Sequence, residues 1–470
     1  MEGMSSSLRA PRAAFVLAAA IIATVCFSIL QSFMAPLLPS LQETFNLSTT
    51  TVTWLMTGYL LSACITAPIV GRLGDIYGHV FVLRIAMLVM TGGMVMQAVS
   101  WNFESLLAAR FIQGCGGAII PLCYVILRRT LPEERVPFAL GIVSSMAALG
   151  GGTGLVMVGL VVHLGDFHLA FWTASVIGAL SSLIVFVGIP ASIDERSRQR
   201  PDALGALLLA IWLSLLLIIV SQGGAFGWLS LPIVLMIVGV VLSFAFWVWW
   251  EQRVSDPVID IRVMKARPVI WSNLLAFYFG IMMFTTQILF PQFLQTAPEN
   301  GYGFGLTVGG ISLAMLPQTA AFGVGGLFAG WLERVIGSRI SIVIGSLFCT
   351  VGFSGLLFLH GNVVQFSSTI VLIGIGIGLT YAQLANVVTR SVPSDKVGAS
   401  TGMNTNIRNI GGAVGTTLAA TIIMAPIGQA APPILNFGIG IGLLIIVSIF
   451  AMLCAWALPH DREERVLVAA

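Results

Sequence analysis

The chain has 470 residues, of which 57% are hydrophobic and only 9% are charged, and its mean hydropathy is +0.98. A soluble domain of this size needs far more polar surface, so the composition indicates a polytopic membrane protein. The formal charge of +3 gives no indication of nucleic-acid binding. The 6 cysteines fall within apolar runs without metal-ligand spacing, which favours buried free thiols over disulfides or a metal site.

Apolar runs of about 20 residues, enough to cross the roughly 30 Å hydrocarbon core of a bilayer, recur along the chain. The runs are continuous rather than alternating, so they predict helices and exclude a β-barrel. The first run leads into further spans and does not resemble a cleavable signal peptide. We expect fourteen membrane-spanning helices, at residues 13–36, 50–71, 80–100, 104–127, 138–162, 167–189, 204–222, 231–250, 268–296, 306–331, 340–359, 363–391, 397–425 and 434–458.

The distribution of the 22 Lys and Arg residues predicts how the chain is oriented. All but two lie in the termini and in every second loop, whereas the other loops carry only acids. Because positive charge is retained on the cytoplasmic side, this asymmetry predicts a multi-pass protein of the plasma or inner membrane with both termini in the cytoplasm. The two exceptions, Arg110 and Arg408, lie inside predicted helices.

Two charged stretches divide the chain into three parts. We expect a six-helix bundle at 1–190, two extra helices between charged linkers at 191–267, and a second six-helix bundle with a short cytoplasmic tail at 268–470. The charged stretch Gly71–Arg84 lies in the first bundle, and a weaker copy, Gly330–Arg339, lies 259 positions further on (from 71 to 330). Parallel halves that carry such a repeat are typical of a transporter that rocks about a central site.

Several motifs carry a family resemblance. They are the loop Gly71–Arg84, the helix-four stretch Ala109–Ala118, and the segments Asp202–Gly205, Asp256-Pro257, Pro291–Gln295 and Gly398–Arg408. With these motifs nearly the whole chain resembles the major facilitator superfamily, and specifically its fourteen-helix drug–proton antiporter branch of multidrug efflux transporters. The resemblance implies an all-α major facilitator fold, two six-helix bundles plus two additional helices, in which the helix-four arginine, here Arg110, is linked to proton coupling.

Three stretches depart from the pattern of that branch. The first helix reads Ile29-Leu30-Gln31-Ser32, where the branch usually carries an aspartate. The fifth helix has Leu155 where a proline would stand, and the outer end of the sixth reads Phe167-His168 instead of Trp-Arg. All three departures count against the expected proton antiport, and none of them counts against transport itself.

The repeated charged stretches predict a cytoplasmic gate in each half. In the first, we expect Asp75 to hold the gate closed against a helix N-terminus or an arginine, because helix N-termini favour negative charge. In the second, Arg334 stands where Asp75 does, so the two gates are not equivalent. The predicted gate residues are Gly71, Arg72, Asp75, Gly78, Arg84 and Arg334.

Proton coupling needs a group that changes its protonation between states, usually a carboxylate or a histidine. No Asp or Glu falls in the middle of a predicted span, so the titratable candidates are Asp75, Glu104 and His168. The family resemblance adds Arg110 to these coupling candidates. Each has a structural alternative: Arg110 bound to carbonyls or glutamines, Asp75 as a gate residue alone, and the other two as interfacial residues.

A larger set of amide, aromatic and cationic side chains lies on the predicted helices. Lining a central cavity, they would bind a mostly apolar ligand through a few polar contacts. The alternative for any one of them is an interhelical hydrogen bond, worth about 0.6 kcal/mol on average. The cavity candidates are Gln31, Gln113, Tyr124, Tyr278, Gln287, Gln292, Gln295, Gln318, Tyr381, Gln383, Asn386, Asn404 and Arg408.

The motifs GxxxxGK[ST], G-x-S-x-G and H-E-x-x-H are absent, so the sequence predicts no ATP-driven transport, no enzyme activity and no cofactor. We expect a secondary transporter that exports hydrophobic or amphipathic small molecules by proton antiport with alternating access. Its partners would be a lipophilic substrate, protons and membrane lipids, but neither nucleic acid nor ATP. Two alternatives stay open: a proton-independent uniporter or exporter of anionic metabolites that uses Arg110 and Arg408, and a transport-like membrane sensor without flux.

Overall fold

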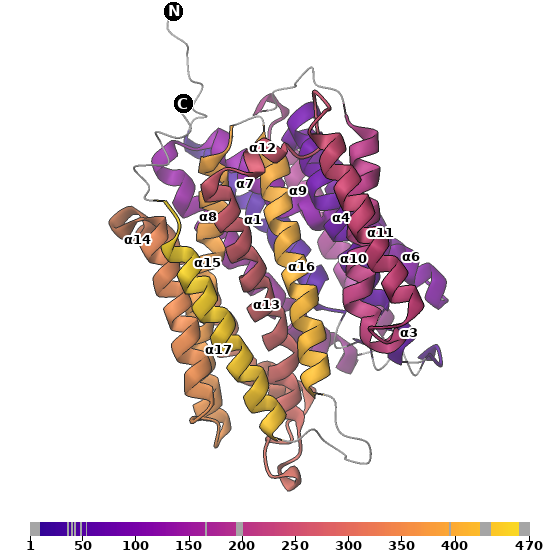
Figure 1. The fold of residues 1–470 in the computed structure, drawn as a ribbon, viewed down its shortest axis with the longest axis vertical. Coiled ribbons are helices and arrows are strands. Elements are labelled where there is room, and N and C mark those ends of the chain that lie inside the picture. Colours follow the sequence, from indigo (N-terminus) through magenta and orange to yellow (C-terminus); the bar gives the residue numbers. More distant parts are fainter. Residues whose placement is uncertain are drawn as a thin grey trace, which may run out of the picture.

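The computed structural model describes residues 10–34, 37–38, 41, 44–47, 49–52, 54–164, 167–193, 201–393, 396–423 and 434–459. Within these ranges the chain is helical and contains no strand, so the predicted all-α class is confirmed. Figure 1 shows long helices packed side by side, most of them running along the longest axis of the molecule.

The helices of the first half are short-linked and follow the predicted apolar runs. They are α1 (Ala10–Ser32), α3 (Thr49–Val52), α4 (Trp54–Tyr77), α5 (His79–Ala98), α6 (Phe103–Gln113), η2 (Gly114–Ala118), α7 (Ile119–Thr130), η3 (Glu133–Arg135), α8 (Val136–Leu164), α9 (Phe167–Gly188) and η4 (Ala191–Ile193).

The remaining helices include the pair α10 and α11, which follows the first charged linker. They are α10 (Ala203–Phe226), α11 (Leu231–Glu251), α12 (Ile261–Met264), α13 (Arg267–Gln295), η5 (Pro298–Asn300), α14 (Val308–Leu356), α15 (Val363–Ser391), α16 (Val397–Ile423) and α17 (Ile434–Trp456).

Within the described ranges, 12 helices are long and apolar enough to cross a membrane. One of them, α14, has 49 residues and joins two runs that the sequence separates, 306–331 and 340–359. Its helical path is interrupted at Gly337, where φ is 84° and ψ is 161°. The polar helix α16 is not among the 12, although its 27 residues amount to about 40 Å of helix.

Two large buried clusters form the cores of the two halves of the chain. One consists of side chains from residues 16–189 with Ala385, and the other of side chains from residues 275–458. The apolar stripes of the helices face these clusters because burying them against one another gives the close packing that drives helix association in lipid.

Helices α10 and α11 pack on each other beside the two cores, at the side of the molecule where α4 and α6 lie (Figure 1). Their cluster includes Trp212 and Trp247, and it also takes up Val258 and Ile259 from the segment that follows α11. Ile65 of α4 and Met403 of α16 pack against the same cluster. The pair therefore touches both halves of the chain.

Gly78 and Gly337 lie 259 positions apart, as in the sequence repeat, and share an unusual backbone conformation. Gly78 links α4 to α5 with φ of 105° and ψ of 134°, close to the values at Gly337. Side-chain-bearing residues avoid positive φ, so only glycine fits both positions without strain. The repeat in sequence is therefore a repeat in backbone geometry.

Candidate functional site

A close backbone contact between the two halves joins α4 to the start of α16. A Cβ atom added to Gly71 would lie 2.5 Å from the carbonyl oxygen of Gly398. One added to Gly398 would lie 2.7 Å from the Gly71 carbonyl oxygen and 2.8 Å from Asp75 Oδ1. The two backbones thus touch with no room for a side chain. We call the end of the bundle that carries Arg72, Arg84, Arg334, Arg390 and Lys396 the basic end.

Asp75 fills the space beside this contact. Its Oδ1 accepts a hydrogen bond from Gly398 N at 3.2 Å, and its Oδ2 accepts one from Ala399 N at 3.1 Å. Both N–H groups belong to the first turn of α16, where they have no partner within the helix and where the helix dipole favours an anion. The buried carboxylate is therefore held by a helix of the other half of the chain.

His79 completes the arrangement, and the sequence did not single it out. Its Nε2 lies 3.0 Å from Asp75 Oδ1, and both side chains are buried. Nδ1 of His79 is buried and has no hydrogen-bond partner in the described part of the chain. The only sequence signal was a histidine four residues after Asp75, across the break between α4 and α5.

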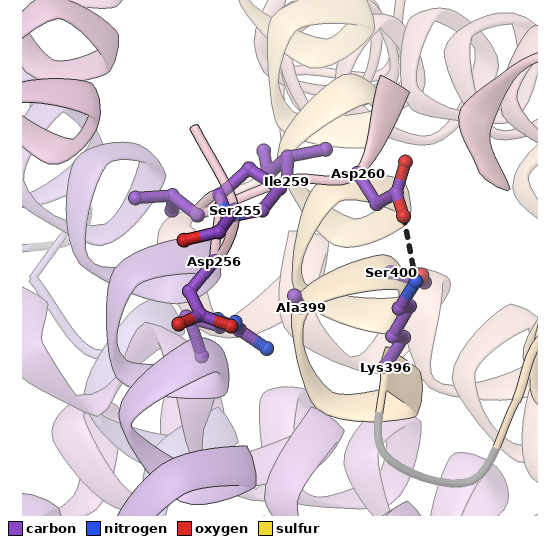
Figure 2. A pocket seen from close by; sticks show the side chains of 10 residues that line it. Ser255, Asp256, Ile259, Asp260, Lys396, Ala399 and Ser400 are labelled. Carbon is purple, nitrogen blue, oxygen red and sulfur yellow. Dashed lines mark hydrogen bonds and ion pairs between the residues drawn. The ribbon is translucent and has the colours of Figure 1, made fainter. Parts of the chain in front are cut away.

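The segment Ser255–Asp260 lies over this contact (Figure 2). Together with Arg72, Lys396, Ala399 and Ser400 it encloses a cavity of about 170 Å³. Lys396, which immediately precedes α16, pairs with Asp260 Oδ2 at 2.6 Å. The other carboxylate oxygen of Asp260 caps α12 by accepting a hydrogen bond from Arg262 N at 2.9 Å.

The electrostatics of Asp260 favour this pairing. Burial by itself raises the pKa of the carboxyl group, but the hydrogen bonds from Lys396 and from the Arg262 backbone outweigh it and lower the pKa below its usual value. The carboxylate is therefore charged at neutral pH, and the pair joins the segment after α11 to the residue immediately before α16.

A second contact joins the halves at the basic end. Gly330 of α14 packs on the start of α8: a Cβ there would lie 2.8 Å from Phe138 Cα and 2.9 Å from the Pro137 carbonyl oxygen. Arg334, one turn further on, donates a hydrogen bond to the carbonyl oxygen of Glu134, in the turn before α8. Arg334, the counterpart of Asp75, thus also forms a hydrogen bond between the halves, but as the donor instead of the acceptor.

Glu333, next to Arg334, is a buried acid that the sequence did not single out. It pairs with Arg390 at 2.6 Å and accepts a hydrogen bond from Asn386 Nδ2 at 2.6 Å. Asn386, a predicted cavity residue, is therefore engaged in a polar cluster of the second half. The buried acids of the described spans, Asp75, Glu251 and Glu333, all lie toward the basic end.

Arg84, a predicted gate residue, does not reach the other half in the structure. Its Nη2 donates to the carbonyl oxygens of Phe186 at 2.9 Å and Ile189 at 2.8 Å, and its guanidinium lies over the Phe186 ring. Cations bind the free carbonyls at a helix C-terminus, and here that helix is α9. The expectation that Arg84 acts in the gate is therefore not supported by its contacts.

Arg110 is fully buried within the first half. Its Nε donates to the Leu55 carbonyl oxygen at 3.0 Å, its Nη1 donates to Gln113 Oε1 at 2.7 Å, and its Cζ lies 4.4 Å from the centre of the Tyr59 ring. Gln113 in turn donates to the Gly93 carbonyl oxygen at 3.0 Å. Among the described residues no carboxylate pairs with Arg110, and Glu104 on the same helix is exposed.

Arg408 has a different setting. Its Cζ lies 4.6 Å from the centre of the Tyr381 ring, and the side chain is only partly buried. Tyr124, whose hydroxyl lies 2.8 Å from Ser144 Oγ, is within electrostatic range of both. Of the predicted cavity residues, Arg408 of α16 thus contacts Tyr381 of α15, and Tyr124 of α7 lies within electrostatic range of both.

The other cavity candidates are dispersed. Gln383 donates to the Ala329 carbonyl oxygen at 2.7 Å, and Asn404 donates to the Ser272 carbonyl oxygen at 3.2 Å, so both form interhelical hydrogen bonds. Tyr278 stacks on Phe450 of α17. Gln287 and Gln295 are exposed, whereas Gln31, Gln292 and Gln318 are partly buried.

His168, a predicted coupling residue, starts α9 on the side away from the basic end. Its ring stacks on that of Phe167 at 4.3 Å, and its Nε2 lies 3.4 Å from the Ser100 carbonyl oxygen. In the part of the chain that the structure describes, no group of three or more His, Cys, Asp or Glu side chains gathers as a metal site would require.

Comparison with known proteins identifies the family. The model of the Major Facilitator Superfamily matches residues 20–416. The chain belongs to the Major Facilitator Superfamily. It is therefore a multi-pass membrane transporter by family, and the paired contacts at the basic end join the two halves of a major facilitator fold.

Relatives of this major facilitator protein carry different names. It is 26% identical over 409 residues to the multidrug resistance protein Stp of Mycobacterium tuberculosis (strain CDC 1551 / Oshkosh), covering 84% of this chain and 73% of Stp. It is 24% identical over 474 residues to the uridine/deoxyuridine transporter of Lactococcus lactis subsp. cremoris (strain MG1363), covering 96% and 95%. The crystal structure of the human organic anion transporter MFSD10 (TETRAN) matches with a TM-score of 0.67 at 14% identity, over 96% of this chain and 100% of that one, which supports the fold alone.

Proposed function

We propose that this major facilitator protein exports amphipathic small molecules across the cytoplasmic membrane by alternating access, driven by the inward proton gradient. In this proposal the basic end and both termini face the cytoplasm, because Lys and Arg are retained on that side. The relative named as a multidrug resistance protein supports efflux as the direction of transport.

The observation that carries the proposal is the pair of contacts between the halves at the basic end. One is held by the Asp75 hydrogen bonds to α16, and the other by the Arg334 hydrogen bond to the turn before α8. Each contact consists of a few hydrogen bonds beside packed glycines, which a rocking motion can break and re-form. The halves would then part at this end to admit substrate from the cytoplasm.

The number and grouping of spans are part of the proposal. Dividing α14 at Gly337 and adding α16 to the 12 apolar helices gives fourteen crossings, arranged as two bundles, at 1–190 and 268–470, with α10 and α11 between them in the chain. The two separate buried clusters support the two bundles as moving units.

For proton coupling, the best-placed titratable pair is Asp75 with His79. It lies in the contact that would open and close, and His79 Nε2 is 3.0 Å from Asp75 Oδ1, within reach for a proton to pass between the two side chains. Glu104 and His168 lie away from this contact, and Arg110 is bound to neutral partners.

The test is transport by purified protein in proteoliposomes, with and without a pH gradient of either sign. We expect a fluorescent amphiphile to move only in vesicles that contain the protein, and faster when protons flow the opposite way. Equal rates after the proton gradient is collapsed would favour the uniporter alternative. No movement of anionic, neutral or cationic amphiphiles would overturn transport and favour the sensor.

A further inference from the structure

In the proposed arrangement of fourteen spans, Arg408 lies near the middle of the membrane. It comes 11 residues after the start of α16 at Val397, about 16 Å along the helix, in a hydrocarbon core about 30 Å thick. An arginine at this depth is costly and is expected to face a partner or a water-filled space.

No partner of opposite charge is present. In the described part of the chain the Arg408 side chain makes no hydrogen bond and no ion pair with a carboxylate, and its guanidinium stacks on the Tyr381 ring. The five N–H donors of a guanidinium are thus left for water or a ligand. Arg110, in contrast, is fully buried and bound to a carbonyl, an amide and a ring.

The surroundings of Arg408 are aromatic and come from both halves. Tyr381 carries the guanidinium on its face and meets the Phe322 ring edge-on at 5.7 Å. Tyr124, from the first half, is within electrostatic range of Arg408 and Tyr381, and its hydroxyl lies 2.8 Å from Ser144 Oγ of α8. The cation therefore lies where a substrate between rocking halves would touch both of them.

We propose that Arg408 binds the acidic group of the substrate, so that the preferred cargo is an aromatic carboxylate whose ring packs on Tyr381, Phe322 and Tyr124. A planar guanidinium matches a carboxylate with two parallel hydrogen bonds, and stacking on Tyr381 fixes its plane. A cationic amphiphile would meet an uncompensated like charge at this point. The inference rests on the proposed transport function and names its substrate class.

The test compares three probes that share one ring system: 2-naphthoate, 2-naphthamide and 2-naphthylmethylammonium, each followed in proteoliposomes. Because a hydrogen bond to a charged group is worth more than a neutral one, we expect the KM for naphthoate to be lower than for the amide by about tenfold or more. Arg408→Gln should raise the KM for naphthoate by about the same factor and leave that for the amide within about twofold.

Arg253→Gln is the matched control. Arg253 lies over the Trp249 ring at 4.0 Å, the same kind of stack, but after α11 and with an exposed side chain. We expect this variant to leave both KM values unchanged. Arg408→Lys serves if Arg408→Gln is not recovered as monodisperse protein: it keeps the charge but loses the fork, so the KM for naphthoate should rise severalfold while that for the amide stays the same.

The outcomes distinguish a preference for anions from transport itself. Transport of the amide or the ammonium probe without preference for naphthoate, or equal effects of Arg408→Gln on acid and amide, would overturn the anion inference and leave transport standing. Failure of all three probes to move would overturn the proposed function itself.

Discussion

Asp75 and Arg334 occupy equivalent positions 259 residues apart, and each side chain crosses to the N-terminal end of a helix in the other half. Asp75 accepts hydrogen bonds from the first turn of α16, whereas Arg334 donates to a carbonyl in the turn before α8. The glycines four residues before them, Gly71 and Gly330, make the two backbone contacts. The two contacts thus have the same arrangement, but the side chain accepts hydrogen bonds in the first and donates one in the second. Because each contact depends on its own side chain, each can be tested by a separate substitution.

Asp75→Asn should weaken the contact between α4 and α16. The amide keeps one acceptor oxygen but loses the negative charge at the helix N-terminus. This lowers the population of the closed state relative to the open state by about tenfold. Cys64 of α4 reports this shift because its thiol is fully buried beside α10 and α16. We expect a water-soluble maleimide to label Cys64 faster in Asp75→Asn, by peptide mass spectrometry, while transport falls.

Labelling of Cys115 and Cys454, which are partly exposed, is the internal control and should not change. If the Asp75→Asn variant labels Cys64 at the same rate as the wild-type protein and transports at the full rate, the gate role of Asp75 is ruled out.

The helices and the repeat could be predicted because both depend on local sequence. Long apolar runs specify the spans, and the spacing of Gly71, Gly78 and their copies reflects one backbone geometry that only glycine adopts easily. The 49-residue α14 contains two predicted runs because Glu333, Arg334 and Arg339 divide its apolar pattern, close to the kink at Gly337.

The partners of the polar residues could not be predicted in the same way. Asp75 meets Gly398 more than 300 positions away in sequence, and nothing local to either residue encodes that pairing. Gln383 and Asn386 have the residue type of a cavity lining, but the helix faces that carry them meet Ala329 and Glu333. The role of His79 could not be predicted because it depends on the turn at Gly78, which brings its side chain back to Asp75.

Gly398→Ala should prevent close contact between α4 and α16. The added methyl group would lie 2.7 Å from the Gly71 carbonyl oxygen and 2.8 Å from Asp75 Oδ1, so the backbones must separate. We expect faster labelling of Cys64 and loss of transport. Gly442→Ala in α17 is the matched control, because a Cβ there meets nothing within 4 Å; it should stabilise the helix by about 0.5–1 kcal/mol and leave labelling unchanged. Equal behaviour of the two variants would contradict the packing argument.

The ion pair between Asp260 and Lys396 should contribute modestly. The side chains are 20% and 32% exposed, and pairs of this kind are typically worth about 0–1 kcal/mol. Because the pKa of Asp260 is lowered in the folded protein, the contribution is full at neutral pH and is lost only as the pH falls through that lowered value. We expect Asp260→Asn and Lys396→Met each to speed the labelling of Cys64 slightly, and the double variant to add nothing further. Fully additive effects would show that the two residues act independently.

Asn406→Leu should stabilise the observed state. Asn406 is fully buried, and its Oδ1 and Nδ2 have no hydrogen-bond partner among the described residues, an arrangement that costs about 1–3 kcal/mol. Leucine has a similar size and no polar atoms, so we expect a higher midpoint of thermal unfolding in detergent. Turnover in proteoliposomes should slow, because the wild-type open state gains hydrogen bonds between water and the Asn406 amide, and the leucine variant loses this gain.

Asn404→Leu is the contrasting variant. Asn404 donates to Asn273 Oδ1 at 2.9 Å and to the Ser272 carbonyl oxygen, so the midpoint of this variant should fall. An unchanged or lower midpoint for Asn406→Leu would mean that the buried amide carries no such penalty.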